Sequence, residues 1–225
     1  ATAAILVLGL ASTAAWLPTM QPDDVGYHLG LHWQLQEHAR YAMDARQQVW
    51  ALAPWAGDVL QGVAQVLAGG EARGALDALW LAIAAGAVFA LAGALGADAT
   101  RRWWALALLG SLPMSMNLVG GMQTELPAMA LLPVLAWLVL REAASGSPRG
   151  LLAGAILFGA LCGLKAVHAA VALPLLGWAG WRHRRAIAWR WLPLAAIAAI
   201  AIGASSYAYA WSIAGNPLLP LLNAT

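Results

Sequence analysis

Two adjacent carboxylates follow the first apolar segment of the chain, and they are the residues best suited to chemistry. Asp23 and Asp24 stand in the sequence Pro22-Asp23-Asp24-Val25-Gly26-Tyr27-His28. A carboxylate held beside an acceptor hydroxyl can serve as a general base. The same oxygens suit a hard divalent cation. We therefore predict a general base at this pair, with a divalent cation as a second use of Asp23 and Asp24.

Further polar residues stand in three short segments that separate apolar stretches. They are Asn117, Gln123, Thr124 and Glu125, then Lys165 and His168, then Asn216 and Asn223. We expect them to line one cavity together with the aspartates. Simpler roles stay open for each group: helix capping for Asp24, a favourable helix-dipole position for Glu125, snorkelling for Lys165 and burial for His168.

Several common functions find no support in the sequence. There is no phosphate-binding loop, no dinucleotide fingerprint and no serine-nucleophile elbow. His28, His32 and His38 lack the spacing and the fourth ligand of a zinc site. The basic residues lie in short loops, where membrane orientation explains them, so we expect no nucleic-acid partner.

The composition predicts that lipid surrounds most of the chain. Of the 225 residues, 62% are hydrophobic and 10% are charged, whereas about 25% are charged in a soluble domain. Because a lone segment in lipid must satisfy its own backbone hydrogen bonds, the spans should be helices. The fold class is therefore all-α, one polytopic membrane domain over 1–225. We predict spans near 2–18, 74–96, 103–120, 124–141, 150–164, 166–180 and 191–213.

The segment 150–180 allows two interpretations, one long tilted helix or two short ones that meet near Gly163-Leu164-Lys165. A lysine in the middle of a single span is costly. Two short helices would put Lys165 at a rim, so we prefer them.

Arginine placement gives the orientation. With seven spans, three loops on one side hold most of the arginines: Arg101 and Arg102, Arg141 and Arg149, and Arg182, Arg184, Arg185 and Arg190. This side should be cytoplasmic. We expect a multi-pass protein of the bacterial inner membrane with its N-terminus in the cytoplasm and its site loops in the periplasm.

The outer loop 19–73 is too long for a plain connector. Its pattern predicts an amphipathic helix over roughly 26–42 and short membrane-surface segments over 50–55 and 57–68. Thirteen tryptophans in the chain, many near span ends, fit interfacial anchoring.

Four motifs in order resemble the GT-C membrane glycosyltransferases, in particular the protein O-mannosyltransferase and lipid A aminoarabinose transferase group. They are Asp23 to His28, Gly121-Met122-Gln123-Thr124-Glu125-Leu126-Pro127, the glycine-rich stretch Gly154 to Lys165, and Gly215-Asn216-Pro217 through Asn223. The chain is similar to the N-terminal portion of such an enzyme. It departs from the pattern at Glu125, where many relatives have Asp, and at Val25-Gly26, where larger residues are common.

The resemblance implies a sugar transferred from a polyprenyl-phosphate donor to an acceptor at the outer face. Asp23, Asp24 and Glu125 would be the catalytic residues, and Tyr27, His28, Lys165, His168 and Asn216 would contact substrate. In this interpretation Asp24 or Asp23 is the general base, Lys165 neutralises the departing lipid phosphate, and Glu125 orients the acceptor or shares a divalent cation.

The alternative function is a non-catalytic GT-C-like subunit or scaffold of a larger membrane complex, with partner subunits. A transporter is the least supported class, because its polar residues should lie at mid-membrane depth in two related halves.

Overall fold

The computed structural model describes residues 1–40, 44, 49–141, 146–219 and 221–222, and these residues form helices and connections without a strand. The predicted all-α class is confirmed for them. The chain divides into two compact units. The first comprises Ala1–Ala42 and Gly57–Trp137, and the second comprises Met43–Ala56 and Leu138–Thr225.

Among the described residues, eight α-helices lie wholly or mostly in the first unit. They are α1 (Thr2–Ser12), α2 (Pro22–Gly26), α3 (Leu31–His38), α4 (Ala56–Ala68), α5 (Arg73–Ala94), α6 (Ala99–Ser111), α7 (Pro113–Val119) and α8 (Glu125–Leu140). Two 3₁₀ turns join them, η1 (Thr13–Trp16) and η2 (His28–Gly30). A core of six buried residues from α1, η1, α5, α7 and α8 ties these elements together: Ala11, Ala15, Leu81, Leu118, Val119 and Leu126.

Glycines let two of these helices approach their neighbours closely. A Cβ added at Gly74 of α5 would lie 2.7 Å from the carbonyl oxygen of Ala15. One added at Gly110 of α6 would lie 3.0 Å from the backbone nitrogen of Leu8 in α1. Small residues at such crossings allow van der Waals contact between backbones. The close packing fixes the end of α1, and with it the segment that carries the aspartates.

The second unit contains η3 (Val49–Leu52), α10 (Pro148–Leu164), α11 (Ala166–Arg182), η4 (Trp189–Trp191), α12 (Leu192–Gly203) and α13 (Ser205–Ala214). Helices α10 and α12 meet at glycines. A Cβ at Gly159 would lie 2.5 Å from the carbonyl oxygen of Ala199, and Gly203 packs directly on the backbone of Gly159. This crossing leaves no room for a side chain on either glycine.

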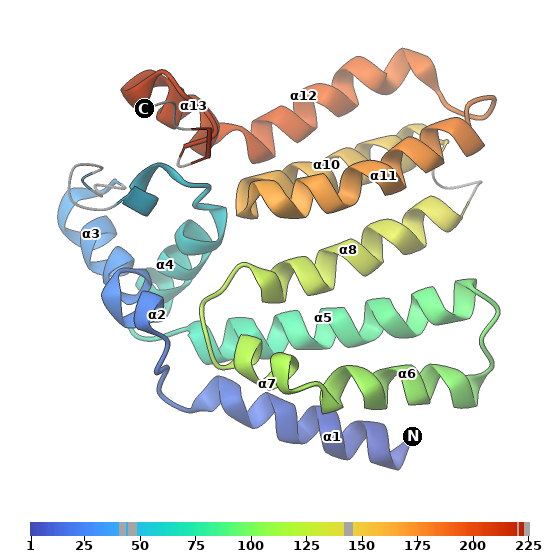
Figure 1. Cartoon of the computed structure of the whole chain (residues 1–225), viewed down its shortest axis with the longest axis horizontal. Helices are drawn as coiled ribbons and strands as arrows, with labels where there is room; N and C mark the ends of the chain where they lie inside the picture. The colour runs from blue at the N-terminus through green and yellow to red at the C-terminus, as the bar shows by residue number, and fades with distance from the viewer. Residues whose placement is uncertain (41–43, 45–48, 142–145, 220, 223–225) are drawn as a thin grey trace. The chain divides into compact units, whose positions relative to one another are not determined.

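The preference for two short helices over 150–180 is confirmed. Helix α10 ends at Leu164 and α11 begins at Ala166, and the two run side by side (Figure 1). Lys165 between them is extended, with φ −169° and ψ 139°. Its backbone N–H donates to Leu161 O at 3.2 Å, which closes the last turn of α10.

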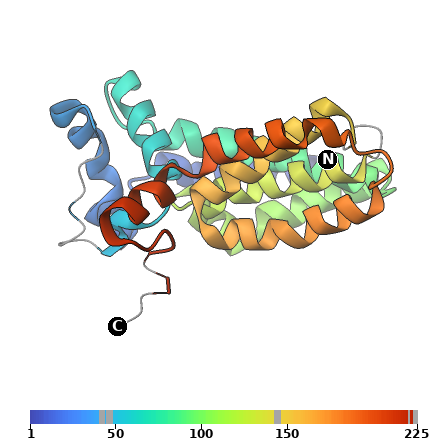
Figure 2. The same cartoon turned by 90° about the horizontal axis from the view of Figure 1, so that it is seen from above.

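The structure does not confirm seven spans. Among the described residues, α5 with its 22 residues is the one helix long and apolar enough to cross a bilayer. Helices α12 and α13 add a second if the bent pair, with its 65° angle, counts as one span (Figure 2). Helix α8 has 16 residues and α10 has 17. At about 1.5 Å per residue, both are shorter than the hydrocarbon core of about 30 Å.

Three predicted spans differ in detail from the helices observed. The span 103–120 is broken between α6 and α7, because Pro113 lacks the N–H that a continuous helix needs. The span 2–18 is α-helical only to Ser12 and continues as the 3₁₀ turn η1. The span 191–213 is interrupted at Ala204.

The predicted amphipathic helix over 26–42 was too long. The helical part is α3, eight residues that end at His38, and Ala39 after it has a left-handed φ of 52°. Residues 41 and 42 lie outside the described part of the chain. The segment predicted over 57–68 is helical as α4, and the one over 50–55 is in part the 3₁₀ turn η3. Their place on a membrane surface stays a prediction.

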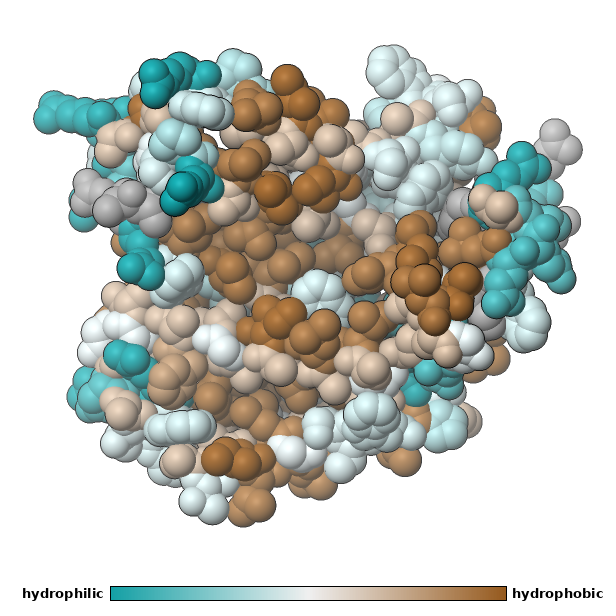
Figure 3. Space-filling model, turned by 180° about the vertical axis from the view of Figure 1, so that it is seen from behind, coloured by the Kyte–Doolittle hydropathy of each residue, from teal (hydrophilic) through white to brown (hydrophobic). Residues whose placement is uncertain are grey.

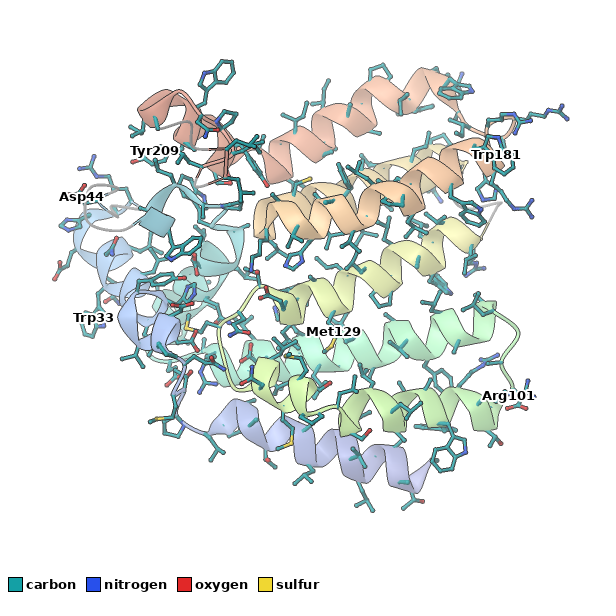
Figure 4. All side chains as sticks on the ribbon, in the orientation of Figure 1. Trp33, Asp44, Arg101, Met129, Trp181 and Tyr209 are labelled. Atoms are coloured by element: carbon teal, nitrogen blue, oxygen red, sulfur yellow. The ribbon has the colours of Figure 1, made fainter. Side chains whose placement is uncertain are left out.

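Large apolar side chains cover much of the surface of both units (Figure 3). In α12 the exposed fractions of Ile197 and Ile200 are 62% and 64%. Trp181, near the end of α11, is 67% exposed (Figure 4).

Candidate functional site

Asp24 is the most strongly positioned of the predicted site residues. It lies in the first turn of α2, is 0% exposed, and accepts two hydrogen bonds at Oδ2. Thr19 Oγ1 donates at 2.5 Å and the backbone N–H of Met122 donates at 3.0 Å. The second oxygen, Oδ1, is buried without a hydrogen-bond partner. One oxygen is thus fixed while the other keeps its lone pairs for a proton or a donor.

The turn between α7 and α8 supplies this contact, so two of the predicted segments meet. Gly121 lies against Asp24 and Gln21, since an added Cβ would be 3.4 Å from Asp24 Oδ2 and 3.2 Å from Gln21 Cγ. Gln21 in turn donates from Nε2 to Asn117 Oδ1 at 2.9 Å and accepts at Oε1 from Gln123 Nε2 at 3.3 Å. These side-chain bonds connect the segment before α2 to both sides of the turn.

Asp23 has a different environment from its neighbour. Its side chain is exposed, in the same first turn of α2. A carboxylate in the first turn of a helix is stabilised by the helix dipole. The structure therefore separates the acidic pair into a buried, hydrogen-bonded Asp24 and a solvent-facing Asp23.

His28 is paired with an acid that the sequence analysis did not single out. Its Nδ1 contacts Oδ1 of Asp58, in the first turn of α4, and both side chains are mostly buried. Burial acts to lower the pKa of His28, but the hydrogen bond to Asp58 and the Asp58 charge outweigh it, so the pKa is raised above 6.5. The pair anchors α4 to the segment after α2.

Tyr27 packs on this pair, with its ring centroid 4.0 Å from that of His28. Burial raises the pKa of Tyr27, and the charges of Asp23, Asp58 and Asp24 raise it further. Its phenol therefore stays protonated at physiological pH and can donate a hydrogen bond.

Arg73, the first residue of α5, holds the surrounding backbone together. It is 2% exposed and donates from Nη1 to Gly120 O at 3.1 Å and from Nη2 to Leu17 O at 2.5 Å. Its Nε donates to Glu71 at 2.8 Å. The guanidinium therefore joins the end of η1 to the turn that contacts Asp24.

Glu125 is half-buried and begins α8, three residues after Met122. Thr124 Oγ1 lies 3.5 Å from its Oε2. Its position in the first helical turn agrees with the helix-dipole role that the sequence left open. A role in orienting an acceptor stays a prediction.

Of the remaining predicted residues, Lys165, His168 and Asn216 belong to the second unit, and Asn223 lies outside the described residues. Lys165 is exposed at the break between α10 and α11, and His168 is buried in α11 with 7% exposure. Asn216 Nδ2 donates to the carbonyls of Leu221 and Leu222, and its Oδ1 accepts from Leu218 N. Asn216 thereby shapes its own turn. That these three side chains share a site with Asp24 stays a prediction.

No group of three or more His, Cys, Asp or Glu side chains suited to a metal ion occurs among the described residues. Asp24 is buried and Asp23 is exposed. A divalent cation shared by the two carboxylates stays a prediction.

Sequence reasoning missed four polar residues of this region: Thr19, Asp58, Arg73 and Asp77. A signal existed for two of them, because Arg73 and Asp77 form an ionisable i,i+4 pair in an otherwise apolar helix. Both are 2% exposed. Ionisable residues of this kind in apolar helices usually mark functional sites.

Comparisons of the chain with family models, curated proteins and solved structures find no match. The GT-C resemblance therefore rests on the four motifs alone.

Proposed function

We propose that this protein is a membrane glycosyltransferase that takes a sugar from a polyprenyl-phosphate donor at the outer face of the bacterial inner membrane. The observation that carries the proposal is the carboxylate of Asp24. It is wholly buried, fixed through Oδ2 by Thr19 and Met122, and unpartnered at Oδ1. Unpaired buried oxygens of this kind are rare in proteins and are concentrated where chemistry is done.

In the proposed reaction, Asp24 Oδ1 takes the proton from an acceptor hydroxyl. The freed oxygen attacks the anomeric carbon, the bond to the phosphate oxygen breaks, and polyprenyl phosphate leaves with that electron pair. The phosphate needs a cation as its charge grows, and Lys165 is the residue we assign to it. Tyr27, which stays protonated, and His28, whose pKa is raised by Asp58, are suited to contact the donor.

The proposal includes a polytopic helical bundle of about seven spans. It is supported by the exposed apolar side chains of α1, α11 and α12 and by the length of α5. Helices shorter than the hydrocarbon core can still span if the bilayer thins locally or if they associate with others. Membrane lipid is then the main partner of the surface.

Donor class is the sharpest test of the proposal. Purified protein in lipid nanodiscs would be given a radiolabelled hexose on either polyprenyl phosphate or a nucleotide diphosphate, together with outer-face membrane extract as a source of acceptors. We expect label to move only from the lipid-linked donor, with release of polyprenyl phosphate. Glu37→Gln, which changes an exposed acid on α3, should behave like the wild type. Transfer from the nucleotide sugar, or from neither donor, would contradict the proposal and favour the scaffold alternative.

A further inference from the structure

Five buried polar atoms without hydrogen-bond partners gather in the first unit. They are Asp24 Oδ1, Gln61 Oε1, Gln65 Oε1 and Nε2, and Asp77 Oδ2. The four residues are 0%, 6%, 1% and 2% exposed, respectively. More than about 90% of buried polar groups in proteins are paired, and each unpaired one costs about 1–3 kcal/mol. Such a concentration indicates that a partner for these atoms belongs here.

The four side chains form one cluster. Gln61 hydrogen-bonds to Asp77, and the negative charge of Asp24 acts on Asp77. Gln65 follows Gln61 by one turn of α4, and both are buried on the same face of that helix. The cluster therefore adjoins the carboxylate to which we assign the chemistry, and it draws on α2, α4 and α5.

Arg73 does not satisfy Asp77. Its Nη1 lies 3.9 Å from Asp77 Oδ2, beyond hydrogen-bond distance. Its donors are engaged with Glu71, Gly120 and Leu17. The guanidinium supplies positive charge to the cluster while leaving the Asp77 oxygen available. That same charge disfavours a second cation at this place.

Helix α4 differs from an ordinary surface helix, because it buries polar side chains and exposes apolar ones. Its amides Gln61 and Gln65 are buried, whereas Leu60, Val63 and Leu67 are 42%, 43% and 82% exposed. If the buried face only had to pack, apolar residues would fill it at lower cost, because unpaired amides are penalised. The inward amides are therefore placed for a polar ligand.

The atoms define the chemistry of that ligand. Four of the five are acceptors, and the fifth, Gln65 Nε2, is a donor. Neutral hydroxyl groups complement this set, because each can donate to a carboxylate or amide oxygen and also accept from an amide. We propose that Gln61, Gln65 and Asp77 form a subsite that binds the hydroxyl groups of the transferred sugar beside Asp24. This inference rests on the proposed function and names the part of the donor that the region recognises.

The test compares binding of a short polyprenyl phosphate that carries a hexose with binding of the same lipid phosphate without the sugar. Equilibrium dissociation constants would be measured in nanodiscs for the wild type, Gln61→Leu and Gln65→Leu. Gln36→Leu is the matched control, because Gln36 is exposed on α3. We expect each buried change to weaken binding of the sugar-bearing lipid about tenfold per lost hydrogen bond. Binding of the sugar-free lipid should be unchanged in every variant.

The outcomes separate the two proposals. Sugar-bearing lipid that binds Gln61→Leu and Gln65→Leu as tightly as the wild type overturns the subsite and leaves water as the ligand of these atoms. An equal loss of affinity for both lipids also overturns the subsite, because the substitution then acts on the fold and not on sugar binding. A wild type that binds neither lipid contradicts the proposed function itself. Thermal stability measured in parallel should stay level or rise in Gln65→Leu, since an unpaired amide is removed, and should fall in Gln61→Leu, which also loses the hydrogen bond to Asp77.

Discussion

The backbone N–H of Met122 donates a 3.0 Å hydrogen bond to Oδ2 of Asp24, ninety-eight positions earlier in the chain. The bond joins the first turn of α2 to the turn between α7 and α8. It brings an acidic residue of the first loop to the segment that precedes Glu125. Each partner lies in a short turn. The hydrogen bond therefore forms only because helix packing holds the two turns in place.

Thr19 should contribute measurably to the stability of this arrangement. Thr19→Val removes the donor at 2.5 Å from a fully buried carboxylate. We expect the free energy of unfolding to fall by about 1–3 kcal/mol. Thr19→Ser keeps the hydroxyl and should lose much less. Thr13→Val, at an exposed hydroxyl that bonds Leu10 O, is the control, and a similar loss there would remove the special role of Thr19.

Arg73 and Asp77 should show strong coupling in a double-mutant cycle. Arg73→Met removes the donor to two carbonyls and the cation beside Asp77, so we expect a loss of about 3–5 kcal/mol in unfolding free energy. Adding Asp77→Leu removes the buried carboxyl that has lost its neighbouring cation and should restore part of that stability. Denaturation in mixed micelles measures both. Additive losses in the double variant would show that the two residues do not interact.

The His28–Asp58 pair predicts a pH dependence of stability. The folded-state pKa of His28 lies above 6.5, because Asp58 outweighs the effect of burial. The pair's stabilisation is therefore fully present below pH 6.5 and is lost as the pH rises through the folded pKa. Thermal midpoints measured across this range should fall toward alkaline pH. In Asp58→Asn the thermal midpoint should depend less on pH. A pH dependence equal to that of the wild type would show that other groups cause it.

The crossing of α10 and α12 should not tolerate a methyl group. Gly159→Ala would put a Cβ 2.5 Å from Ala199 O, and such overpacking costs about 1–3 kcal/mol. Gly154→Ala, whose Cβ would lie 3.8 Å from Leu138 Cδ2, has room. It should be neutral or stabilising, because alanine favours helix. Equal midpoints for the two variants in a thermal-shift assay would contradict the close approach.

Part of this structure could be predicted from residue types alone. The break at Lys165 follows from the cost of a charge within an apolar span, and α4 follows from its apolar pattern. The break at Pro113 was missed in the predicted span 103–120, although proline cannot continue a helix. The end of α3 could not be predicted, because Ala39 adopts a left-handed conformation that its residue type does not favour.

In the candidate site, too, some features could be predicted from the sequence and others could not. The acidic pair was visible because charge is scarce in this chain, but which member is buried depends on Thr19 and Met122, contributed by different turns. The burial of the polar face of α4 could not be predicted from the sequence. Periodicity distinguishes a polar face from an apolar face without indicating which of the two is buried. Gln61 and Gln65 therefore became visible only in three dimensions.

The central claim is that the carboxylate of Asp24 takes the acceptor's proton. Its most direct test is the single-turnover rate of hexose transfer from a polyprenyl-phosphate donor by Asp24→Asn, with donor binding measured on the same sample. Positioned base catalysis contributes about 10²–10⁴-fold. We predict a rate lower by that factor with donor affinity retained. Transfer by Asp24→Asn at the wild-type rate would contradict the account.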